Sequence, residues 1–163
     1  MKKLLTVAAA LICAASFAAE TANAALKFDC KNFKYYGKSG YTFEDGKNGK
    51  VGAMIGDSGW SLQLVVPKTL DLEKTYELYA LVRGTFDKAS ENGFGGIGVY
   101  DTAAKKVIGN TRVAVKQMNN AEYQRIKVGT FKFNKNMYVY IGGVTPKNPA
   151  NRVFVKEFEF VAK

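Results

Sequence analysis

The chain has 163 residues, a formal net charge of +10, two cysteines and no histidine. The lack of histidine excludes a Ser-His-Asp triad, a Cys-His nucleophile pair and imidazole metal sites. A chain of this length can bury an adequate core as a single domain.

The first element in chain order is a predicted secretory signal at residues 1–24. Lys2 and Lys3 precede an apolar run from Leu4 to Phe17, and the sequence then reaches Ala22-Asn23-Ala24. A basic start, an apolar run and small residues at the cleavage point define a signal peptide. The apolar run is too short for a membrane anchor.

Cleavage after the predicted signal leaves residues 25–163, in which 22 basic and 13 acidic residues give a charge of +9. Cys30 is then the single thiol, so the mature chain holds neither a zinc finger nor an internal disulfide. We expect a secreted or periplasmic protein without a transmembrane segment, in which Cys30 is a buried small residue of the first strand.

Several later segments alternate apolar and polar side chains with a period of two, which indicates strands. They are residues 60–66, 75–83, 111–116 and 137–141, and a last segment in which Phe154, Phe158 and Phe160 share a parity that Lys156 interrupts. Turn-forming pairs such as Asn48-Gly49 and Asn92-Gly93 separate such runs. Strands with one apolar side and one solvent-exposed side are typical of antiparallel sheets. We therefore predict one all-β domain at 25–163 with eight to ten strands, as an antiparallel two-sheet sandwich.

Two short motifs resemble catalytic or cofactor signatures. Residues 93–98 fit the pattern G-x-G-x-x-G, but they run into a predicted strand, whereas a dinucleotide site needs a helix there. Residues 56–59 resemble the nucleophile segment of a serine protease, but the chain has no imidazole to serve as the base. Both are interpreted as turns or strand faces, and no cofactor is predicted.

Thirteen carboxylates remain in the mature chain, and a glycosidase needs only two of them at a suitable separation. Most lie in turns or at strand positions whose side chains point outward. No two of them are placed at the ends of predicted strands in a pattern typical of a catalytic pair. The sequence also lacks a D-x-D-x-D-G calcium loop. Neither a catalytic residue nor a metal ligand is predicted.

A longer stretch carries a family resemblance. Trp60-Ser61-Leu62-Gln63-Leu64, Pro67, Leu70 and residues 75–83 resemble a galactose-binding-like β-sandwich, and residues 98–101, 127–131 and 153–160 continue the pattern. The resemblance is to carbohydrate-binding modules of secreted bacterial polysaccharide-degrading enzymes. It implies a non-catalytic jelly roll of about eight strands, often with a sugar site and sometimes with a structural calcium. In that family the last strand usually has an acidic residue before an arginine, whereas this chain has Lys156-Glu157.

Sugar sites combine aromatic rings, which stack on the C–H faces of pyranoses, with polar groups that hold hydroxyls. Strand parity points several tyrosines and basic residues outward, where such rings are uncommon without a partner. We predict a carbohydrate-binding concave face composed of Tyr79, Arg83, Tyr100, Arg112, Lys116, Tyr138 and Tyr140. A second candidate surface holds Tyr35, Tyr36 and Tyr41 beside a loop rich in glycine and lysine. The parity of Trp60 matches that of Leu62 and Leu64, which favours a place in the core.

The expected function is that of a secreted, non-catalytic β-sandwich that binds a polysaccharide or other glycan, an acidic one included, and that does not bind nucleic acid. The alternative is an extracytoplasmic structural or surface-interaction protein without a glycan ligand, held to anionic envelope polymers or to a protein by its charge. The lysines are spread through turns, which is typical of a solubilising surface. Sugar stacking survives high salt, whereas charge-driven attachment weakens steeply.

Overall fold

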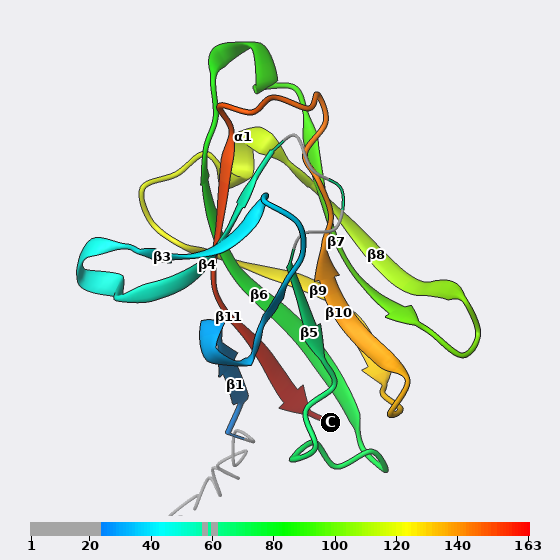
Figure 1. Ribbon diagram of the computed structural model, residues 1–163. Coiled ribbons are helices and arrows are strands. Elements are labelled where there is room, and N and C mark those ends of the chain that lie inside the picture. The colour runs from blue at the N-terminus through cyan, green and yellow to red at the C-terminus, as the bar shows by residue number, and fades with distance from the viewer. Residues whose placement is uncertain (1–23, 57–58, 60–61) are drawn as a thin grey trace, which may run out of the picture.

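The computed structural model describes residues 24–56, 59 and 62–163, and in that part of the chain it has eleven strands. The strands form two antiparallel sheets that pack face to face as a sandwich (Figure 1). The predicted all-β, antiparallel two-sheet class is thus confirmed. Trp60 and all of the predicted signal peptide except Ala24 lie outside the described residues.

One sheet, here called sheet A, has the strand order β3–β4–β11–β6–β9, with β1 also paired to β11. Its strands are β1 (Leu26–Asp29), β3 (Gly40–Glu44), β4 (Lys50–Ile55), β6 (Thr75–Thr85), β9 (Gln124–Lys132) and β11 (Arg152–Ala162). The other sheet, sheet B, has the order β2–β5–β10–β7–β8. Its strands are β2 (Lys34–Tyr35), β5 (Leu62–Val65), β7 (Phe94–Asp101), β8 (Lys106–Ala114) and β10 (Met137–Ile141).

Short helical turns connect some of these strands. They are α1 (Val115–Met118) and the 3₁₀ turns η1 (Cys30–Asn32), η2 (Gly46–Asn48) and η3 (Lys88–Ser90). Within the described residues, no helix is both long enough and apolar enough to cross a membrane.

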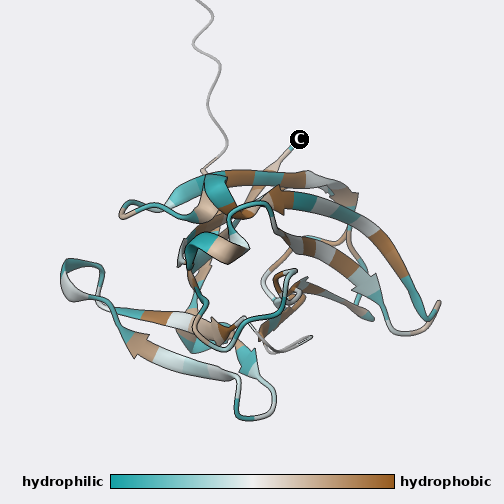
Figure 2. Ribbon diagram, turned by 90° about the horizontal axis from the view of Figure 1, so that it is seen from above, coloured by the Kyte–Doolittle hydropathy of each residue, from teal (hydrophilic) through white to brown (hydrophobic). Residues whose placement is uncertain are grey.

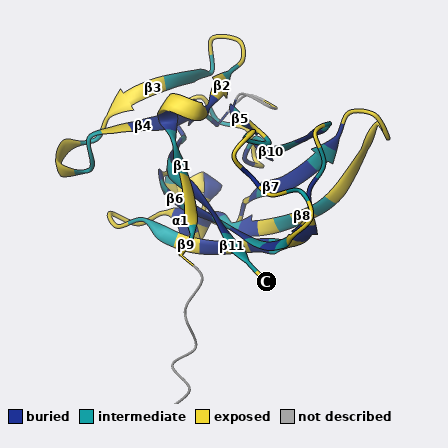
Figure 3. Cartoon of the chain, turned by 90° about the horizontal axis from the view of Figure 1, so that it is seen from below, coloured by how far each residue is buried: buried dark blue, intermediate teal, exposed yellow. Residues whose placement is uncertain are grey.

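The core lies between the two sheets and follows the predicted parity on most strands. Leu78 and Val82 of β6 and Val139 of β10 are fully buried, as are Leu62 and Phe158. Teal and brown alternate along the strands in Figure 2, as expected for strands that have one side in the core. In Figure 3 the central strand β11 is largely buried, whereas the edge strands β3 and β8 have long exposed stretches.

The parity of the last strand changes at a β-bulge. The pairing of β11 with β6 shifts between Val155 and Glu157, so that Lys156 is the extra residue. Phe158 and Phe160 point into the main core, whereas Phe154 belongs to a small cluster with Val51 of β4. The prediction that Phe154 shares a face with Phe158 and Phe160 is therefore wrong.

Two other sequence predictions differ from the structure in detail. The strand predicted at 111–116 ends at Ala114, and Val115 and Lys116 belong to α1. Cys30 is buried as predicted, but it starts the turn η1 instead of lying in a strand. Its thiol donates to the carbonyl oxygen of Lys50 at 3.3 Å, and burial raises its pKa.

Candidate functional site

The seven residues predicted to share one face lie in both sheets and in the helix. Tyr79 and Arg83 are on β6 of sheet A, and Lys116 is on α1. The other four are on sheet B: Tyr100 on β7, Arg112 on β8, and Tyr138 and Tyr140 on β10. Because outward residues of the two sheets lie on opposite surfaces of a sandwich, the structure brings together the sheet B residues and separates them from Tyr79 and Arg83.

Arg83 is held by neighbours within sheet A. Its Nε donates to Asp45 at 3.0 Å, and its guanidinium lies 4.3 Å from the ring centroid of Phe154. The Tyr123 hydroxyl donates to the same carboxylate at 2.6 Å. These hydrogen bonds, that of Arg83 foremost, lower the pKa of Asp45. Only 14% of the Arg83 side chain is exposed, so its donors are used within the protein.

Tyr79 lies in a ladder of ion pairs on the outer face of sheet A. The Arg125 guanidinium is 3.4 Å from its ring centroid, and its hydroxyl donates to Glu77 at 2.7 Å. Glu77 also contacts Lys127 at 2.6 Å and Lys163 at 3.0 Å. The hydrogen bond from Lys127, with those from Tyr79 and Lys163, lowers the pKa of Glu77 to about 2. This face therefore satisfies its own polar groups.

The outer face of sheet B is different in character, and its centre is a pair of tyrosines. Tyr138 of β10 lies directly opposite Tyr100 of β7, with ring centroids 5.4 Å apart and ring planes inclined by 31°. On its other side, Tyr138 lies opposite Val65 of β5. Tyr100 lies opposite Val107 of β8. One row across four strands is thus apolar and aromatic.

Tyr140 occupies the next row and is buried beneath its neighbours. It lies opposite Gly98, and a Cβ added at Gly98 would come within 2.6 Å of the Tyr140 hydroxyl. The absent side chain thus leaves room for the ring, whose hydroxyl accepts a hydrogen bond from Asn110 Nδ2 at 2.9 Å. Tyr140 is only 2% exposed, so it can support Tyr138 from below but offers little surface of its own to a ligand.

Tyr36, which the predicted concave face left out, joins this group. It follows Tyr35 of β2, whose side chain packs against the core, so strand alternation directs Tyr36 to the outer face of sheet B. Burial, and then electrostatic interaction with the phenols of Tyr100, Tyr36 and Tyr140, raises the pKa of Tyr138. The side chain of Tyr36 is 44% exposed. Tyr36, Tyr100, Tyr138 and Tyr140 are called the tyrosine cluster below.

Exposed apolar side chains gather on the same sheet. In the described part of the chain, seven large apolar residues are exposed, and five of them lie on sheet B or directly after β2. The five are Tyr36, Val65, Phe94, Val107 and Ile108. Val65 and Val107 flank the paired tyrosines in one row, so exposed apolar side chains continue that row on both sides.

Two basic residues of the predicted site lie beyond the tyrosine cluster. The Arg112 guanidinium packs 4.3 Å from the ring centroid of Phe94, a geometry typical of a cation–π contact. Phe94 also lines a shallow pocket of about 170 Å³ with Lys116 and Glu91. Arg112 is therefore a member of the sheet B face, and Lys116 lies at its border beside an acidic residue.

The remaining candidate surfaces divide between the two sheets. Tyr35 packs against the core and its hydroxyl donates to Cys30 at 3.2 Å, whereas Tyr41 of β3 packs in the small cluster around Phe154. The structure thus separates Tyr36 from both of them. No group of three or more acidic or thiol side chains in the described residues could hold a metal ion.

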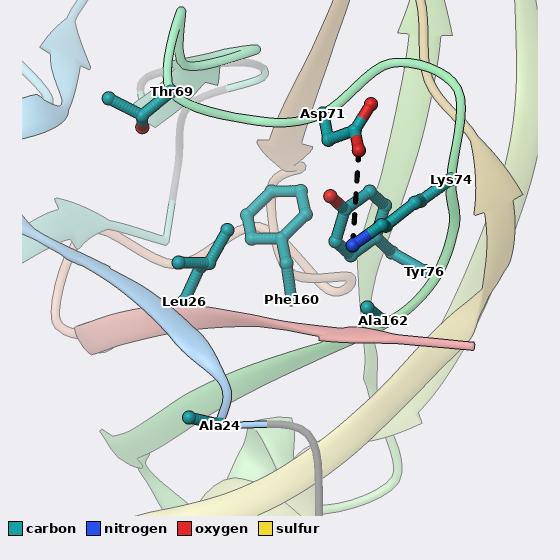
Figure 4. A pocket seen from close by; sticks show the side chains of 8 residues that line it. All are labelled: Ala24, Leu26, Thr69, Asp71, Lys74, Tyr76, Phe160 and Ala162. Carbon is teal, nitrogen blue, oxygen red and sulfur yellow. Dashed lines mark ion pairs between the residues drawn. The ribbon is translucent and has the colours of Figure 1, made fainter.

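A pocket of about 230 Å³ opens between β1, β6, β11 and the loop before β6 (Figure 4). Its floor is made by Tyr76 and Phe160, which are core residues. Asp71 and Lys74 at its mouth contact each other at 3.9 Å. Its charged groups are therefore paired with each other, and the pocket has no aromatic platform open to solvent.

No protein-family model and no curated protein sequence matches the chain. Solved structures do match it, at sequence identities that show the fold alone. The module CsCBM6-3 from Clostridium stercorarium, solved with cellobiose, has a TM-score of 0.56 and 16% identity, over 85% of this chain and 94% of that one. The CBM22-1 xylan-binding domain of Paenibacillus barcinonensis Xyn10C has a TM-score of 0.56 and 10% identity, over 86% of this chain and 96% of that domain.

The xylan-binding module CBM15 matches with a TM-score of 0.51 and 11% identity, over 86% of this chain and 97% of the module. The fold is therefore that of the β-sandwich of carbohydrate-binding modules, as the resemblance in the sequence implied. The chain spans only 23% of an α-L-arabinofuranosidase structure and 27% of a xylanase structure that it also matches. The three binding modules named here are instead matched over 94% or more of their length.

Proposed function

We propose that the protein is a secreted, non-catalytic module that binds polysaccharide on the outer face of sheet B, through Tyr36, Tyr100 and Tyr138, with Tyr140 beneath them and Arg112 at one side. The observation that carries the proposal is the Tyr100–Tyr138 pair, with ring centroids 5.4 Å apart on adjacent central strands. Rings fixed by neighbouring strands offer apolar area to sugar C–H groups at little cost in side-chain entropy.

The difference between the two sheets supports this placement. Tyr79 and Arg83 are in contact with Arg125, Glu77 and Asp45, so a ligand on sheet A would have to compete with existing ion pairs. The sheet B face has exposed apolar side chains instead. The match to three carbohydrate-binding modules over nearly their whole length supports the same function.

Affinity electrophoresis in gels containing xylan, hydroxyethylcellulose, galactan or polygalacturonate tests the proposal. We expect at least one polymer to retard the protein and Tyr138→Ala to reduce that retardation. Loss of one stacking ring removes about 1.5–3 kcal/mol, which corresponds to an affinity loss of about 10- to 100-fold. Tyr100→Ala should have a similar effect because the two rings lie opposite each other.

Tyr79→Ala is the matched control, because it removes the same side chain from the other sheet. It should bind as the unmodified protein does, and far-ultraviolet circular dichroism should confirm that all variants are folded. The proposal fails if no polymer retards the protein. The assignment to sheet B fails if Tyr79→Ala abolishes binding and Tyr138→Ala does not.

Export is a separate part of the proposal. A basic start, an apolar run and Ala22-Asn23-Ala24 support cleavage before Ala25. Expression in a bacterial host should yield a periplasmic or secreted product whose intact mass corresponds to residues 25–163. A product in the cytosol with its first 24 residues retained would contradict it.

A further inference from the structure

We propose that the polysaccharide bound on the outer face of sheet B is anionic, with carboxylate or sulfate groups along its chain. This inference rests on the proposed function and names the class of polymer. Its basis is a separation of charge between the two outer faces of the sandwich.

On the outer face of sheet A, acidic and basic side chains are paired with each other. Asp45 pairs with Arg83, Glu77 with Lys127 and Lys163, and Glu159 with Lys27 and Arg125. Lys27 also reaches Glu157 at 3.0 Å. Each of these carboxylates therefore has a cation from a neighbouring strand or loop, and the cations so paired are not available to a partner.

The strands of sheet B contain almost no acidic residue. Among the described residues of β2, β5, β7, β8 and β10, Asp101 is the only carboxylate. It is 6% exposed, and it accepts hydrogen bonds from the backbone of Ala103 and Ala104 and from Asn134. Because Asp101 is turned away from solvent, the described strands of sheet B present no exposed carboxylate, and Glu91 lies only at the border of the face, beside Lys116.

Cations lie at both edges of this face. Lys34 on β2 lies opposite Gln63, which in turn lies opposite Tyr140, so Lys34 shares the outward side with the tyrosine cluster. Arg112 on β8 lies opposite Gly96, two residues along β7 from Gly98. Both are exposed, and neither has an ion pair with a described residue. Within the described residues, both are therefore available to an anionic ligand.

Two further lysines lie at the end of the face marked by Val65. A hollow of about 400 Å³ is lined by Val65, Leu70 and Leu72, with Lys68 and Lys135 at its border. Val65 is the neighbour of Tyr138 across the strands, so this hollow continues the row of apolar side chains. Lys68 and Lys135 are exposed, and neither takes part in an ion pair among the described residues.

The separation of these cations suits a polymer better than a single sugar. Lys34 and Arg112 lie on strands that are four positions apart in sheet B, which corresponds to about 19 Å at the usual spacing between strands. A chain of several sugars that crosses the tyrosine cluster reaches both. The planar Arg112 guanidinium, steadied by the Phe94 ring, matches the fork of a carboxylate or the oxygens of a sulfate.

The test compares charged polymers with neutral counterparts of the same backbone. Polygalacturonate is compared with its methyl ester, alginate with its propylene glycol ester, and dextran sulfate with dextran. Isothermal titration at pH 7 in about 0.1 M NaCl should give at least one charged polymer an affinity about tenfold or more above that of its neutral counterpart. A gain with the uronates identifies carboxylate as the recognised group, and a gain with dextran sulfate alone identifies sulfate.

A pair of double variants locates the effect. Lys34→Gln with Arg112→Gln should lower the affinity for the charged polymer several-fold more than the affinity for its neutral counterpart, and so remove most of the advantage of the charged polymer. Lys47→Gln with Lys50→Gln removes the same charge from the exposed β3–β4 hairpin of sheet A, and it should leave both affinities nearly unchanged.

The inference is overturned if every neutral polymer binds as well as its charged counterpart, a result that leaves the proposed function intact. It is also overturned if the hairpin variant weakens binding as much as the sheet B variant, since net charge alone would then explain the preference. If no polymer in either panel binds, the proposed function fails and the inference with it.

Discussion

Asp45 and Arg83 form an ion pair that fastens the β3–β4 hairpin to the middle of sheet A. The guanidinium donates from Nε at 3.0 Å and from a second nitrogen to the other carboxylate oxygen. The side chains are only 12% and 14% exposed, and Tyr123 donates to the same carboxylate. A pair so shielded is stronger than one on an open surface.

Asp45→Asn should lower the free energy of unfolding by about 1–2 kcal/mol at pH 7, because charge-assisted hydrogen bonds are lost. The folded protein holds the pKa of Asp45 below its unfolded value. The contribution of the carboxylate is therefore fully present above about pH 4 and is lost as the pH falls through the lower, folded pKa. Urea unfolding from pH 7 down to pH 2 should show the difference between the two proteins shrinking at the acid end.

Asp71→Asn is the control for that experiment, because Asp71 meets Lys74 at 3.9 Å with both side chains more than half exposed. Exposed pairs contribute little, so its unfolding midpoint should hardly change. If the difference in free energy of unfolding between the unmodified protein and Asp45→Asn stayed constant with pH, the ionised Asp45 carboxylate would not be the source of the stabilisation.

Gly98→Ala should disturb the tyrosine cluster from beneath. A Cβ at this position would lie 2.6 Å from the carbonyl oxygen of Gly109 and 2.6 Å from the hydroxyl of Tyr140. Because the carbonyl belongs to the backbone of the neighbouring strand, it cannot move aside freely. Strain of this kind costs about 1–3 kcal/mol of stability, and the displaced ring should weaken polysaccharide binding as well.

Gly142→Ala provides the comparison for Gly98→Ala. Its Cβ would meet the carbonyl oxygen of Gly96 at 3.6 Å and Tyr140 at 3.9 Å, which are ordinary contacts. Its thermal midpoint and its binding should stay close to those of the unmodified protein. Equal effects of the two substitutions would show that close approach at Gly98 does not position Tyr140.

Phe154→Ala should act on one end of sheet A. Phe154 packs against Phe43 of β3, with centroids 5.0 Å apart, and against the guanidinium of Arg83. Its loss should speed hydrogen exchange in β3 and β4 while the amides of sheet B keep their protection. Phe158→Ala, in the core between the sheets, should instead cost about 3–5 kcal/mol and raise exchange throughout. Uniform loss of protection in Phe154→Ala would contradict this division.

The neighbours Tyr35 and Tyr36 should have separate roles. Tyr36→Ala should weaken polysaccharide binding about tenfold without lowering the thermal midpoint, since Tyr36 is exposed and follows the inward-facing Tyr35 at the edge of sheet B. Tyr35→Ala should lower the midpoint, because its ring packs on the core and its hydroxyl bonds to Cys30. A drop in midpoint for Tyr36→Ala, with binding retained, would remove Tyr36 from the site.

Much of the sandwich can be predicted from local alternation. β10 begins and ends at the predicted residues, 137 and 141, and β6 begins at the predicted Thr75. Alternation reports only which way a side chain points relative to its own strand. It therefore identified Tyr79 and Tyr138 equally as outward residues, although they lie on opposite surfaces.

The features that the sequence did not reveal depend on contacts between distant segments. Arg83 was predicted to be free for a ligand, but Asp45, 38 residues earlier, holds it. The bulge at Lys156 reverses parity within one strand, which a uniform period of two cannot describe. Alternation could have placed Tyr36 on the outer face, because Tyr35 before it points inward. However, β2 has only two residues, which is too short for its alternation to be recognised as a strand.

The position of β11 has a consequence for how the chain reaches its folded state. This strand is the eleventh in sequence order, yet it lies in the middle of sheet A and pairs with β1, β4 and β6. Until it has left the ribosome, β1 and β4 have no bridge to β6, and the aromatic core that Phe158 and Phe160 complete is missing. Sheet A therefore cannot close until synthesis has passed residue 160.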